Sequence, residues 1–95
     1  MKVLVMTVNL RAEWSHSLKE KRMVVRSIIQ KLRNKFNISV SEVGNQDLHN
    51  YITIGMSSIC GSSALLDSIS ENIINFIEDN TDAELLNIEK DIIRF

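Results

Sequence analysis

The sequence contains no proline and only three glycines among its 95 residues. Stretches rich in these residues separate domains in many proteins, and none is present here. No internal repeat or low-complexity segment divides the chain either. We therefore predict a single domain over residues 1–95, which is long enough for a modest core and too short for two.

Cysteine and long apolar runs are also scarce. The one cysteine, Cys60, excludes an internal disulfide and fits a reducing compartment. The apolar N-terminal segment meets a charge at Arg11, too early for a membrane span of about 20 residues. No small-residue cleavage site follows, so we expect no signal peptide. These absences predict a cytoplasmic protein without a membrane partner.

Motifs for catalysis, cofactors and metals are missing as well. The two histidines have no cysteine or carboxylate at ligand spacing, so we predict no metal site. Gly44, Gly55 and Gly61 are scattered and form no phosphate-binding loop. No nucleophile lies beside a base in the sequence, and we predict neither enzyme activity nor a cofactor.

The pattern of apolar residues predicts an α+β fold. Apolar residues recur at helical spacing over 18–36 and 63–79. Alternation and apolar content favour strands over four other segments, residues 2–11, 37–43, 50–60 and 84–94. The order βαββαβ is that of the ferredoxin-like split βαβ arrangement. Right-handed crossovers then place both helices on one face of a four-stranded antiparallel sheet with strand order 4-1-3-2.

The second face of this sheet is predicted to stay open. It would carry small and apolar side chains of the two central strands, namely Val3, Val5, Thr7, Tyr51, Thr53 and Gly55. An RNA-recognition motif needs several aromatic side chains on these strands, and Tyr51 stands nearly alone. The open face or an edge strand could instead support a homo-oligomer, which is one of our two functional hypotheses.

Charge is distributed unevenly along the chain. Residues 1–48 carry nine Lys or Arg and four Asp or Glu, a balance of 9 − 4 = +5. Residues 49–95 carry two basic and eight acidic side chains, a balance of 2 − 8 = −6. This asymmetry indicates either two solvated helix faces or a molecule with a basic pole and an acidic pole.

The first helix has a clear start signal in the stretch "SLKE" at residues 17–20. Ser17 and Glu20 have the spacing of a capping box. The Ser17 side chain would accept from the backbone N–H of Glu20, and Glu20 would reach back to the N–H of Ser17. These residues therefore have a structural role whatever else the segment does.

Basic side chains form a row on this helix. At 100° per residue, four cations fall within an arc of about 60° beside the apolar stripe. They are Lys19, Arg22, Arg26 and Arg33. Such a row fits contact with RNA phosphate, which supplies most sequence-independent affinity for nucleic acids. The alternative is that the cations only keep the helix face solvated.

Three further side chains have open roles. Lys21 projects into the apolar arc, where it could extend along the start of the helix to reach solvent or form a structural ion pair with Glu42. Trp14 lies in the loop before the helix. It could pack over the helix end or stack on an exposed RNA base, and we include it among the candidate RNA-binding residues.

Three segments resemble the YlxP-like family of uncharacterised bacterial proteins: "SLKEKR" at 17–22, "KLRNKFNISVSEVGNQD" at 31–47 and "ITIG" at 52–55. The resemblance extends over nearly the whole chain. It implies a small cytoplasmic protein of ferredoxin-like fold, with no established activity or cofactor. Genes of the family commonly lie between those of translation initiation factor two and ribosome-binding factor A, which implies a partner in translation or ribosome maturation.

Overall fold

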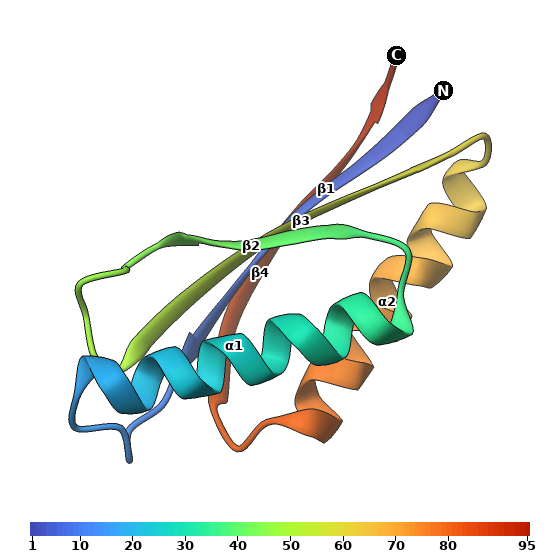
Figure 1. The fold of residues 1–95 in the computed structure, drawn as a ribbon. Coiled ribbons are helices and arrows are strands. Elements are labelled where there is room, and N and C mark those ends of the chain that lie inside the picture. The colour runs from blue at the N-terminus through green and yellow to red at the C-terminus, as the bar shows by residue number, and fades with distance from the viewer.

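The computed structural model describes residues 1–95 and contains two layers, a sheet and a pair of helices (Figure 1). The elements follow one another as βαββαβ, as predicted. Their bounds are β1 Lys2–Arg11, α1 Leu18–Lys35, β2 Ser39–Gly44, β3 Tyr51–Cys60, α2 Ser63–Asn80 and β4 Glu84–Arg94. The second strand begins two residues later than expected, because Phe36 ends α1 in an extended conformation and pairing with β3 starts only at Ser39.

The four strands form one antiparallel sheet in the order β2-β3-β1-β4. This is the predicted order, read from the other edge, and it confirms the ferredoxin-like α+β fold. The two long central strands, β1 and β3, pair over their full lengths from Lys2 with Cys60 to Arg11 with Tyr51. Figure 1 shows both helices on the same side of the sheet.

The core lies between the helices and the inner face of the sheet. The alternation in β1 and β3 directs every second side chain into this layer, where Leu4, Val8, Ile52 and Ile54 are fully buried. Helix α1 contributes Leu32 among others to the same core. This packing fixes α1 in rotation, so Arg22, Arg26 and Arg33 stay exposed outside the core, whereas Lys21 is buried.

Two positions in the β2–β3 region restrict the residue type, Gly55 through the space beside it and Asn45 through its backbone conformation. A Cβ on Gly55 would lie 2.9 Å from Val43 Cγ1, so glycine lets the Val43 side chain pack across the open face. Asn45 is the one non-glycine residue with positive φ, at 55°, a conformation that asparagine tolerates better than most residues. The turn after β2 is therefore tightly defined, and it forms one end of the site described next.

Candidate functional site

The start of α1 is fixed by side-chain hydrogen bonds. The Ser17 hydroxyl accepts a hydrogen bond of 3.1 Å from the backbone N–H of Glu20. The Glu20 carboxylate accepts from the backbone N–H of His16 at 3.1 Å, one residue before the partner expected from the capping box. The contact between Glu20 and His16 extends the cap into the preceding loop. Together the two hydrogen bonds hold the first turn of α1, from which the basic residues follow.

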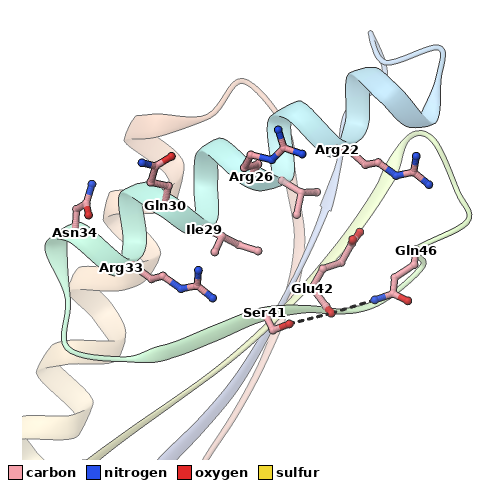
Figure 2. A pocket seen from close by; sticks show the side chains of 10 residues that line it. Arg22, Arg26, Ile29, Gln30, Arg33, Asn34, Ser41, Glu42 and Gln46 are labelled. Carbon is pink, nitrogen blue, oxygen red and sulfur yellow. Dashed lines mark hydrogen bonds between the residues drawn. The ribbon is translucent and has the colours of Figure 1, made fainter.

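Three of the four predicted basic residues line one groove, between α1 and the edge strand β2 (Figure 2). Arg22, Arg26 and Arg33 come from α1. This groove, called the arginine groove below, has a volume of about 590 Å³. The other lining residues are Val25, Ile29, Gln30, Asn34, Ser41, Glu42 and Gln46. The fourth basic residue, Lys19, is exposed on the same helix but does not line this groove.

None of the three groove arginines forms a salt bridge, because the four ion pairs of the protein involve only Arg11, Lys21 and Lys90 as cations. The guanidinium of Arg33 does donate a hydrogen bond of 3.1 Å to the backbone carbonyl of Val40 on β2. All three side chains are exposed. The groove therefore presents positive charge that no acidic side chain of the protein neutralises directly.

Lys21 and Glu42 lie against each other below this groove. Lys21 is 1% exposed, and its Nζ lies 3.0 Å from Glu42 Oε2. The same ammonium donates a hydrogen bond to the Asn45 backbone carbonyl in the β2–β3 turn. The contact with Glu42 is electrostatic, since its angles are not those of a hydrogen bond. Lys21 thus connects α1 to both β2 and the turn that follows it.

Two backbone carbonyls on the outer edge of β2 accept hydrogen bonds from side chains. Arg33 donates to the Val40 carbonyl, and Gln46 Nε2 donates to the Glu42 carbonyl at 3.3 Å. An occupied edge is a weaker template for another strand. Ser41 and Gln46 did not emerge from the sequence as site residues, because only the fold brings β2 and its turn beside α1.

Trp14 lies on the opposite flank of α1 from the arginine groove. It is 46% exposed and lines a separate hollow of about 480 Å³ with Met23, Lys31, Asp79 and Asp82 among other residues. The structure thus separates Trp14 from Arg22, Arg26 and Arg33, which the sequence had placed in one candidate RNA-binding set. The indole therefore does not line the arginine groove.

The open face of the sheet carries a polar row that the sequence did not reveal. Asn45 Nδ2 donates to Thr53 Oγ1 at 2.9 Å, and Thr53 Oγ1 donates to Asn9 Oδ1 at 2.6 Å. Asn9 Nδ2 then donates to Asn87 Oδ1 at 2.7 Å, which connects β1 to β4. These hydrogen bonds connect the β2–β3 turn, β3, β1 and β4 at this end of the open face, and the side chains satisfy part of one another's hydrogen-bonding capacity.

Next to that row, Arg11 contacts one tyrosine and two glutamates. Contact with the Tyr51 hydroxyl, followed by the carboxylates of Glu13 and Glu84, raises the pKa of Arg11 above its usual value. An arginine is protonated at physiological pH in any case, so this cluster is a fixed ion-pair network.

No group of three or more His, Cys, Asp or Glu side chains lies close enough to hold a metal ion. Cys60 is a free thiol. Neither helix is long and apolar enough to cross a membrane.

Known proteins similar to this chain point to one family. Residues 3–90 match the profile of a family described as "Protein of unknown function (DUF503)". The "Uncharacterized protein YlxP" of Bacillus subtilis (strain 168) is 36% identical over 62 residues, covering 65% of this chain and 67% of that protein. Neither description names a catalytic activity.

Two solved structures resemble the fold. The de novo designed protein Foldit4 aligns with a TM-score of 0.54 and 11% identity, covering 100% of this chain and 99% of that one. A REP-associated tyrosine transposase bound to a REP hairpin aligns with a TM-score of 0.43 and 20% identity, over 98% of this chain and 56% of that one. The first likeness supports the fold alone, and the second is too low to support a functional comparison.

Proposed function

Because the chain belongs to the DUF503 family, whose function is unknown, we propose a role from the geometry of the α1–β2 groove. The protein is a non-catalytic cytoplasmic binding protein that contacts RNA phosphate through Arg22, Arg26 and Arg33, with Lys19 extending the contact. The RNA belongs to a translation or ribosome-maturation complex, in keeping with the gene context that the YlxP-like resemblance implies.

One observation carries this proposal: three arginines without acidic partners line one open groove. Along an α-helix, Arg22 and Arg26 are about 6 Å apart in rise, and Arg33 lies about 10 Å further. Guanidinium groups bind phosphate oxygens with two parallel hydrogen bonds. A row of this length suits several successive phosphates of one strand and requires no particular base sequence.

The test is recovery of the tagged protein from its native cytoplasm at low salt, followed by analysis of co-purifying RNA and ribosomal subunits. Arg22→Gln with Arg26→Gln should remove most of the bound RNA. The matched control is Lys31→Gln with Lys35→Gln, which removes the same charge from α1 outside the groove. The control should retain the RNA.

With purified single-stranded RNA, each lost phosphate contact should lower the magnitude of the salt slope of the binding constant by about 0.7. Circular dichroism establishes that each variant is folded. If the folded arginine variant binds RNA like the unmodified protein, or if both double variants lose equal affinity, the groove is not the binding site.

A second candidate function is a homo-oligomeric interaction module that binds no nucleic acid. It is favoured by exposed apolar residues on the open sheet face, namely Val5, Ile59 and Ile93, which are 37%, 66% and 46% exposed. Light scattering over a wide concentration range distinguishes the two functions. A stable oligomer without any affinity for RNA would favour this second candidate.

A further inference from the structure

The arginine groove also contains one carboxylate, which pairs with Lys21 and with none of the arginines. Glu42 projects from β2 into the groove, and Figure 2 shows its side chain directed toward α1. No salt bridge joins it to Arg22, Arg26 or Arg33. A groove that bound only phosphate would be weakened by a carboxylate, because like charges repel at close range.

The two oxygens of this carboxylate differ in their surroundings. Oε2 has no contact with solvent and lies 3.0 Å from Lys21 Nζ. The side chain as a whole is 19% exposed, so Oε1 is the oxygen available to a ligand in the groove. Lys21 keeps the carboxylate in place, and its own contact with the Asn45 carbonyl keeps the ammonium in place.

A ligand that satisfies this lining needs an anionic part for the guanidinium groups and a neutral N–H donor for Oε1. A nucleotide whose base has an exocyclic amino group combines the two. An ionised carboxylate accepts hydrogen bonds and donates none. Adenine, cytosine and guanine carry an exocyclic amino donor, whereas uracil has carbonyl acceptors instead and only its ring N–H to donate.

We propose that Glu42 is a specificity-determining residue that accepts a hydrogen bond from the amino group of a base while the arginines hold the adjacent phosphates. This inference rests on the proposed function and adds a base preference to it. Single-stranded RNA rich in adenine or cytosine binds more tightly than RNA rich in uracil. Since only one oxygen is available, the preference is about five- to tenfold, in the range of one typical hydrogen bond.

The experiment measures fluorescence anisotropy of labelled oligo(A), oligo(C) and oligo(U) of equal length, titrated with the full-length protein at low salt. The unmodified protein should bind oligo(A) and oligo(C) about five- to tenfold more tightly than oligo(U). Glu42→Gln keeps the shape of the side chain but replaces the carboxylate with an amide that can also donate. It should bind oligo(U) more tightly and bring the ratio close to one.

Asp47→Asn is the matched control, because it removes one negative charge from the exposed β2–β3 turn outside the groove. It should strengthen the binding of all three oligonucleotides equally and leave their ratio unchanged. A base preference lost in both variants would mean that net charge, rather than Glu42, sets the ratio, and the inference would be wrong.

Glu42→Gln leaves the Lys21 ammonium without its anionic partner and can weaken the fold. The double variant Lys21→Met with Glu42→Gln removes both charges and should also lose the preference. A folded variant of either kind that still favours oligo(A) and oligo(C) overturns the role of Glu42. Equal binding of all three oligonucleotides by the unmodified protein overturns it as well and leaves the proposed function standing, whereas no binding at all removes both.

Discussion

Helix α1 is held on its two flanks by different kinds of contact. Toward β2 the contacts are polar: Lys21 pairs with Glu42, and Arg33 donates to the Val40 carbonyl. Toward α2 the contact is aromatic, with the rings of Phe36 and Phe76 centred 5.6 Å apart in an edge-to-face arrangement. The polar contacts span the arginine groove, whereas the two rings fill the space between α1 and α2 where they meet.

The largest effect is expected from Leu32→Ala, beneath both flanks. Leu32 is 0% exposed, and its truncation should lower the free energy of unfolding by about 2–5 kcal/mol. Chemical denaturation measures this change. Ser27→Ala, on the exposed surface of the same helix, should stay within about 0.5 kcal/mol of the unmodified protein. Similar losses in the two variants would contradict a core located under Leu32.

A smaller loss is expected on the polar flank from Lys21→Met. The variant leaves the Glu42 carboxylate largely desolvated without its cation, which should cost about 1–3 kcal/mol. Adding Glu42→Gln should restore part of this stability, because a pair of neutral side chains avoids the unpaired charge. A double-mutant cycle by denaturation measures the coupling. Additive losses would show that the two side chains do not interact.

On the aromatic flank, Phe76→Leu should lower the free energy of unfolding by about 1 kcal/mol beyond the area lost, because it removes the edge-to-face contact with Phe36. The coupling of Phe76→Leu with Phe36→Leu should be insensitive to salt. The coupling between Lys21 and Glu42 should respond more to salt, although its burial limits the change. Equal salt dependence on the two flanks would remove the distinction between them.

The smallest effect is expected from Arg33→Gln. The guanidinium is exposed, so loss of its hydrogen bond to the Val40 carbonyl should cost about 0.5 kcal/mol or less. Lys35→Gln, next to it in the last turn but outside the groove, is the control in the same denaturation experiment. A loss above 1 kcal/mol for Arg33→Gln alone would mean that the edge of β2 depends on this side chain.

Periodicity alone predicted much of the fold. The alternation in residues 2–11 and the helical spacing in 18–36 both correspond to observed elements, because burial on one face imposes these periods on the sequence. The strand order followed from the handedness of the crossovers. Element ends were less predictable, as the late start of β2 shows, since pairing rather than composition determines where a strand begins.

The site was only partly predictable. Helical phase placed Arg22, Arg26 and Arg33 on one face, and strand phase brought Glu42 toward Lys21. Trp14 was grouped with the arginines because it is near them in the sequence. The loop before α1 instead carries it to the other flank, a direction that no local periodicity determines.

By itself, the sequence determined which residues face the core, where α1 starts and which of its sides is basic, because these properties depend on spacing within one element. The tertiary structure decided that the basic side meets the edge strand β2, that Gln46 and Arg33 cover its carbonyls, and that Glu42 faces the arginines without pairing with them. Those outcomes depend on the distance and register between elements far apart in the chain. Packing of the whole core sets that distance and register, and no short stretch of sequence specifies them.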